Sequence, residues 1–322
     1  MTDSVGERGL TAEREHSMKE KLTRRDMLKL GGGTLAGVSL LGLAGCGGGG
    51  GSSSSGNSSK TLTLGNIGWA ENLAVSNLTK VLFEEDLGYE EVELKLLDVG
   101  PLFQGVAGGD LHAFQDVWMP NHEDLLAKVE DDVEHLDPWF QGQTAFGLAV
   151  PHYMENIRSI ADLNGAGTDT ILGIEPGAPF MEVVEKDVIP AYNLNLELKA
   201  SSTAGMLAEV ERLYSNKEPL VFMPWVPHPM NQDYEYHFLE DPKDAQGTYD
   251  EPAKISTVVN GDLESDDPAA YAFMKTYTLT EDQLNSLMDE ITKADDEAEG
   301  AKAWLQQNRN VVDPWVQAAK QA

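Results

Sequence analysis

Apolar and polar residues along residues 60–322 alternate in short blocks that predict β-strands separated by amphipathic helices. Strands are expected at 62–69, 92–97 and 111–118, with helices between them at 72–85 and 101–107. The longer helix has apolar residues three and four positions apart, and Gly88 ends it. This alternation indicates an α/β fold in which crossover helices join the strands of a sheet.

The alternation continues through the second half of the chain. Strands are expected at 146–150, 171–174, 196–198, 220–223 and 255–259, and helices at 180–188 and 203–214. Thr280 and Gln283 form a capping box that opens a further helix. We expect two lobes, lobe one from residues 60–145 and 232–322 and lobe two from residues 146–231.

Three of the expected strands end in a tryptophan, at Trp69, Trp118 and Trp225. Open α/β sheets bind their ligands in the crevice beyond the carboxyl ends of their strands. A single tryptophan is more often a core residue, but three with the same placement favour a pocket. Aromatic faces attract a cation that cannot donate hydrogen bonds, such as a quaternary ammonium group.

Four short motifs occur in an order that is specific to one family. The chain contains Gly68-Trp69-Ala70-Glu71-Asn72, Asp116-Val117-Trp118-Met119-Pro120, Gly173-Ile174-Glu175-Pro176-Gly177 and Trp225-Val226-Pro227-His228-Pro229-Met230-Asn231. It resembles the substrate-binding proteins of ABC importers for choline and glycine betaine from about residue 62 to residue 304. The resemblance implies a two-lobed periplasmic-binding-protein fold, type II-like, with the ligand in the cleft between the lobes.

The resemblance also implies an aromatic box of Trp69, Trp118, Tyr153 and Trp225 around a trimethylammonium group. Glu71 stands where the choline-binding branch has an aspartate that faces the cation. That branch has an asparagine after Glu-Pro-Gly, and this chain has Ala178 there, so a partner for the choline hydroxyl is lost.

The other end of the ligand needs a polar partner. His228 is the candidate for binding a carboxylate or hydroxyl, although a histidine satisfied by nearby backbone is an equal alternative. Gly177 either brings backbone N–H groups to a carboxylate or only starts a helix. For Glu71, the alternative to facing the cation is that it is an exposed residue in the first turn of a helix. We expect glycine betaine to bind at least as well as choline, because a carboxylate accepts charge-assisted hydrogen bonds.

The formal net charge of −31 excludes binding to nucleic acid or to an anionic membrane face by electrostatics. The excess of acidic over basic residues lies after residue 59, since the first 59 residues hold 7 Lys and Arg against 6 Asp and Glu. A solvated, soluble surface explains this acidity, and adaptation to a saline environment is a second interpretation. We expect a monomer.

No sequence motif of an enzyme is present, whether Gly-x-Ser-x-Gly, a P-loop or His-Glu-x-x-His. The histidines are scattered, so neither a metal site nor a cofactor is expected. Two alternatives to an importer binding protein remain at this point, a membrane-anchored sensor of the same fold and a hydrolase using His228 with Asp233. We do not expect an enzyme.

The first 46 residues are expected to be an export signal. Thr23-Arg24-Arg25-Asp26-Met27-Leu28-Lys29 resembles a twin-arginine signal, and an apolar run follows it. Leu43-Ala44-Gly45-Cys46 resembles a lipobox, whose cysteine becomes lipidated. Cys46 is the only cysteine, which excludes a disulfide within the chain. Residues 47–59 are almost entirely Gly and Ser, a flexible tether, so we expect a lipid-anchored extracytoplasmic protein that serves an ABC permease and its ATPase.

Replacing Cys46 by Ala should release the protein from the membrane, because the lipidated residue is lost. Replacing both Arg24 and Arg25 by Lys should block export instead. Fractionation of cells into membrane and soluble material measures both outcomes. A Cys46→Ala protein that stays on the membrane after a salt wash would contradict the lipobox.

Overall fold

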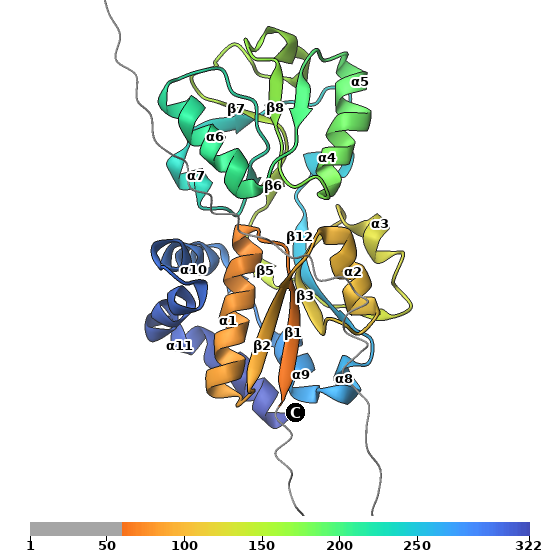
Figure 1. The fold of residues 1–322 in the computed structure, drawn as a ribbon, viewed down its shortest axis with the longest axis vertical. Coiled ribbons are helices and arrows are strands. Elements are labelled where there is room, and N and C mark those ends of the chain that lie inside the picture. Colours follow the sequence, from red (N-terminus) through yellow and green to blue (C-terminus); the bar gives the residue numbers. More distant parts are fainter. Residues whose placement is uncertain (1–59) are drawn as a thin grey trace, which may run out of the picture. The chain divides into compact units, whose positions relative to one another are not determined.

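The computed structural model describes residues 60–322, and lobe one is built there on a five-stranded sheet (Figure 1). Its strands, in spatial order, are β2 (Glu91–Leu96), β1 (Thr61–Asn66), β3 (Ala113–Met119), β12 (Lys254–Asn260) and β4 (Val133–His135). β1 is parallel to β2 and β3, whereas β12 runs antiparallel to β3 and β4. Parallel neighbours end at the same edge of a sheet, so Trp69 and Trp118 both lie at the carboxyl edge of lobe one.

Helices bury the apolar residues of this sheet. α1 (Ala70–Asp86) packs on β1, β2 and β3, and α2 (Val99–Ala107) packs on β1, β3 and β12. α9 (Pro268–Thr276), α10 (Glu281–Lys293) and α11 (Glu297–Gln321) pack together, with α10 and α11 also on α1. The remaining elements of lobe one are α3 (Glu123–Leu126), α8 (Leu263–Asp266) and the parallel pair β5 (Phe140–Gln141) and β13 (Leu279–Thr280). The predicted capping box at Thr280 and Gln283 is confirmed.

Three tryptophans outside the predicted box are packing residues of lobe one. Trp304 and Trp315 are buried on α11, and Trp139 is buried in the segment between β4 and β5. The ring of Trp139 stacks on Tyr277 at 5.6 Å between centroids, and its N–H donates to the carbonyl of Gln115 at 2.8 Å.

Lobe two contains a second, smaller sheet. β8 (Thr170–Leu172) is parallel to β9 (Glu197–Lys199), and β7 (Ala149–Pro151) is antiparallel to β11 (Tyr236–Phe238). Phe222 forms isolated bridges to β8 and β7 and thereby joins the two pairs. The residues predicted as a strand at 220–223 are buried, but only Phe222 takes part in β pairing, so the strand is reduced to one bridging residue. The other elements are β6 (Ala145–Phe146) paired with β10 (Trp225–Val226), α4 (Pro179–Val183), α5 (Ile189–Tyr192), α6 (Thr203–Ser215), α7 (Met230–Asp233) and short helical turns at 160–165, 184–188 and 247–250.

The chain returns to lobe one later than the sequence predicted. Residues 236–238 pair with β7, and the ring of Tyr249 packs on Phe146 and Phe180, all within lobe two. The return therefore comes after residue 250, just before β12. The prediction at residue 232 was wrong because β11 is short and partly exposed, so its apolar pattern is weak. With this correction lobe one comprises residues 60–144 and 251–322, and lobe two comprises residues 145–250.

The predicted export signal, Cys46 and the Gly/Ser tether lie outside the described residues. Within residues 60–322, no helix combines the length and the apolar character needed to cross a membrane.

Candidate functional site

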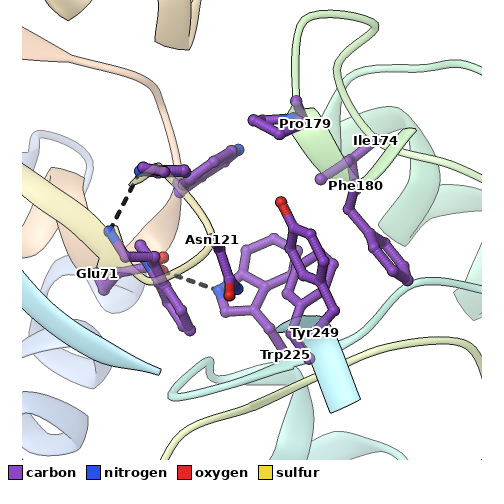
Figure 2. A pocket seen from close by; sticks show the side chains of 12 residues that line it. Glu71, Asn121, Ile174, Pro179, Phe180, Trp225 and Tyr249 are labelled. Carbon is purple, nitrogen blue, oxygen red and sulfur yellow. Dashed lines mark hydrogen bonds between the residues drawn. The ribbon is translucent and has the colours of Figure 1, made fainter. Parts of the chain in front are cut away.

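A pocket lies where the carboxyl ends of the strands of both lobes meet (Figure 2). The space between its lining residues amounts to about 330 Å³, part of which is open to solvent. Lobe one contributes Trp69, Glu71, Trp118, Asn121 and His122, and lobe two contributes Phe146, Ile174, Ala178, Pro179, Phe180, Trp225 and Tyr249. Because both lobes supply walls, the pocket exists only when the lobes are closed.

The three predicted tryptophans all line this pocket. Trp69 is the residue before α1, Trp118 is near the end of β3, and Trp225 begins β10. Their side chains are largely buried, and the ring centroids of Trp69 and Trp225 lie 6.3 Å apart at 55°. Phe146 stacks on Trp225 at 6.0 Å and 29°. These rings give the pocket the aromatic walls that suit a weakly hydrated cation.

Each of these tryptophans donates its indole N–H to a carboxylate. Trp225 donates to Glu71 at 3.0 Å, Trp118 donates to Asp116 at 2.9 Å, and Trp69 donates to Glu175 at 3.2 Å. An aromatic side chain with its polar atom satisfied by the protein is free to present its face to a ligand. Where these acidic groups are ionised, they also add negative charge close to the rings, which favours a cationic group between them.

Glu71 and Asp116 are buried to an unusual degree for carboxyl groups, and both are fully shielded from solvent. Burial raises the pKa of Glu71 well above its ordinary value, and the nearby charge of Asp116 raises it further. Burial likewise raises the pKa of Asp116 to about 7. One oxygen of each carboxyl group has no hydrogen-bond partner among the described residues. Each of these two carboxyl groups is therefore favoured either to retain its proton or, when ionised, to lie next to a cation.

His122 lines this pocket with a buried imidazole ring. Burial lowers the pKa of its imidazole to about 3, so the ring is neutral near pH 7. The backbone N–H of Trp118 donates to Nδ1 of His122 at 3.2 Å, which leaves the ring proton on Nε2. An Nε2–H group in an aromatic pocket can donate to a carboxylate or a hydroxyl. Asn121 lies beside it, and its side-chain oxygen is buried without a partner in the described residues.

Two residues expected in the site lie elsewhere. Tyr153 does not line the pocket, since its hydroxyl donates to the carbonyl of Glu218 at 2.7 Å and its ring packs on Tyr214. His228 lies behind Trp225, with 4.6 Å between ring centroids, and its Nδ1 accepts from the backbone N–H of Met230. The alternative of a histidine satisfied by nearby backbone is therefore correct, and His228 does not face the ligand pocket.

The residues that take these places were missed by the sequence reasoning. Phe146 and Tyr249 provide the further aromatic walls in lobe two, and His122 is the histidine that lines the pocket in place of His228. For His122 a signal was available, because it stands only four residues after Trp118, just beyond the end of β3. No comparable signal was available for Tyr249, because it lies in the short helical turn at 247–250, outside every predicted strand.

The turn after β8 does not offer a free amide at Ala178. Its N–H donates to the carbonyl of Glu175 at 2.9 Å, which closes the turn that leads into α4. Glu71, in contrast, is not an exposed first-turn residue, since it is buried and faces the pocket (Figure 2). Within residues 60–322, no cluster of three or more potential metal ligands occurs.

Two α/β lobes with an aromatic pocket between them define a periplasmic-binding-protein-like solute-binding protein, a class that captures a small molecule without transforming it. The family model for the substrate-binding domain of ABC-type glycine betaine transport systems matches residues 60–307. The chain belongs to this family. Its relatives are binding proteins and not enzymes, as expected from the sequence.

Individual relatives agree with this assignment. The glycine betaine/carnitine transport binding protein GbuC of Listeria monocytogenes serotype 1/2a (strain 10403S) is 33% identical over 150 residues. The match covers 46% of this chain and 49% of GbuC, so the chain spans about half the length of this curated relative.

Solved structures match over a larger share of the chain. Lactococcal OpuAC, closed on glycine betaine, is 30% identical with a TM-score of 0.72, covering 80% of this chain and 99% of that one. An ABC-transporter choline-binding protein in an unliganded semi-closed conformation is 26% identical with a TM-score of 0.70, covering 79% and 91%. The two-lobed fold implied by the sequence resemblance is thus confirmed.

Replacing Asp116 by Asn should change how stability depends on pH. With a pKa of about 7, folded Asp116 keeps a proton that the unfolded chain has released at its ordinary pKa of 3.8. Unfolding therefore releases a proton between about pH 4 and pH 7. The contribution of this group to the free energy of unfolding falls as pH rises, by at most about 1.4 kcal/mol per pH unit.

The measurement is chemical denaturation of wild type and Asp116→Asn at several pH values across this window. The difference between the two proteins removes the contributions of buried His122 and His228, whose lowered pKa values act in the opposite direction and which both proteins contain. It reports Asp116 together with its effect on the pKa of Glu71. Asn retains an acceptor oxygen for Trp118. A difference that stays constant across the window would contradict a raised pKa at Asp116.

Proposed function

We propose that this protein captures a quaternary ammonium osmolyte, glycine betaine or choline, and delivers it to an ABC importer. The observation that supports this most strongly is the aromatic pocket with a carboxylate on every tryptophan N–H. Aromatic rings attract the methyl groups of a trimethylammonium ion. The buried carboxyl groups supply negative charge, and because they are shielded from solvent they do not draw the ion toward a better-hydrated position. The family membership and the ligands named for the relatives point in the same direction.

Glycine betaine fits this pocket better than choline. Its carboxylate is a charged acceptor for the Nε2–H of His122, and such bonds are stronger than neutral ones. Ala178 has no side-chain polar group for the hydroxyl of choline. Against this, ionised Glu71 would favour a ligand of net positive charge, but its raised pKa reduces that preference. We infer that glycine betaine binds at least as tightly as choline.

The delivery pathway is also part of this proposal. Lipid attachment at Cys46 would keep the protein on the outer side of the cell membrane, and residues 47–59 would let it turn toward a permease. The acidic surface of residues 60–322 is consistent with a monomer that remains soluble between encounters.

Replacing Trp225 by Ala should weaken glycine betaine binding by on the order of 2 kcal/mol or more, because a desolvated aromatic wall is lost. Isothermal titration calorimetry measures this change. Trp304→Ala is the matched control, since Trp304 is equally buried but lies on α11 away from the pocket. It should lower stability and leave affinity unchanged. Equal losses of affinity in the two variants would contradict the aromatic pocket.

Replacing His122 by Ala should weaken the binding of glycine betaine by about tenfold or more relative to the wild type, because a hydrogen bond to a charged acceptor is lost. The affinity for choline should fall less, since its hydroxyl is a neutral acceptor. His228→Ala provides the comparison, because His228 packs behind Trp225 and should affect both ligands alike. If His228→Ala changes the ratio of the two affinities and His122→Ala does not, the assignment of the donor is wrong.

A further inference from the structure

Two of the three indole–carboxylate hydrogen bonds connect the lobes. Trp69 of lobe one donates to Glu175 of lobe two, and Trp225 of lobe two donates to Glu71 of lobe one. The third bond, from Trp118 to Asp116, stays within β3. Each lobe therefore supplies the carboxylate that fixes a tryptophan of the other lobe. Figure 2 shows the bond between Trp225 and Glu71.

Glu175 is held in place by its own lobe. The backbone N–H of Thr203, the first residue of α6, donates to Oε1 of Glu175 at 2.7 Å. The hydroxyl of Thr203 donates to Oε2 at 2.9 Å, and Trp69 donates to that same oxygen. The carboxylate is thus oriented within lobe two before Trp69 reaches it. Glu175 does not line the pocket. It can affect a ligand through Trp69, and its charge also helps to raise the pKa of Glu71, which does line the pocket.

Glu71 is placed in lobe one by the backbone of α1, since it lies in the first turn of that helix. The side chain of its neighbour Asn72 accepts from the backbone N–H of Ile67, just after β1, at 2.9 Å. Trp225 is 1% exposed and Glu71 is fully buried, so opening the lobes breaks a shielded bond. The two lobes also approach closely near Gly177, where an added Cβ would lie 3.2 Å from Cβ of Asp98.

We infer that Glu71 and Glu175 are positioning residues that form a reciprocal latch, each orienting a tryptophan of the opposite lobe when the lobes close. Opening the pocket breaks both bonds together, and closing restores both. A ligand leaves only through the open state, so the latch slows dissociation. Binding also requires the closed state, so the apparent affinity falls with the fraction of molecules that can close.

The test uses Glu175, because Glu71 also lines the pocket. Glu175→Met has similar length but no acceptor for Trp69, whereas Glu175→Gln keeps an acceptor oxygen and removes only the charge. Stopped-flow tryptophan fluorescence gives the dissociation rate of glycine betaine. Glu175→Met should raise the dissociation rate by about tenfold or more, because a hydrogen bond to a charged group is lost. Glu175→Gln should raise the rate less. The association rate should change little in either variant.

Ser286→Ala is the matched control. Ser286 accepts the indole N–H of Trp304 at 2.8 Å within lobe one, so this variant also removes a tryptophan acceptor but not a contact between lobes. It should dissociate ligand at the wild-type rate. Wild-type dissociation in Glu175→Met, or an equal increase in Ser286→Ala, would overturn the latch. An equal increase in Glu175→Gln and Glu175→Met would also overturn the latch, because the loss of charge alone would then explain the effect.

The kinetic test rests on the proposed function, and a measurement without ligand separates the two. Small-angle X-ray scattering of the ligand-free proteins should give a larger radius of gyration for Glu175→Met than for wild type and Ser286→Ala. If wild type binds no quaternary ammonium ligand but this difference is found, the function is wrong and the latch stands. If wild type binds but the radii are equal, the latch is wrong and the function stands.

Discussion

The hydrogen bond from a tryptophan N–H to a carboxylate is the interaction on which the rest of this site depends. A buried indole N–H without a partner is unfavourable, and a tryptophan free to rotate would not present its face to a ligand. Trp69, Trp118 and Trp225 each avoid both problems by donating to an acidic side chain. The positions of α1, β3 and β10 are arranged around these three bonds.

This arrangement requires carboxyl groups to be buried, which disfavours their charged forms. The raised pKa values of Glu71 and Asp116 are the direct result. A trimethylammonium group brought between the rings offsets part of that penalty, because its charge opposes the carboxylates that are otherwise poorly solvated. The same electrostatics that destabilise the empty pocket therefore favour a cationic occupant, and a neutral His122 beside it can receive the opposite end of a zwitterion.

Much of the fold was predictable because its elements have strong local patterns. The alternation of apolar residues located β1, α1, β3 and α6 to within a few residues, and the capping box located the start of α10. Strand order and the lobe boundary near residue 250 were harder, since β7 and β11 are only three residues each and are paired by contacts distant in sequence. Short strands contain too few residues for a period of two to be recognised.

The sequence by itself determined the three tryptophans of the pocket and the class of ligand they suit, because each stands at or just after the end of a strand predicted from a local pattern. Only the tertiary structure decided the remaining members. Glu71 is buried because Trp225, 154 residues later, covers it, and no local pattern contains that contact. Tyr153 and His228 have suitable chemistry but face Glu218 and the back of Trp225, whereas His122, Phe146 and Tyr249 face the pocket. The direction of a loop side chain is set by the packing of both lobes, which is why residue type and spacing could not select between them.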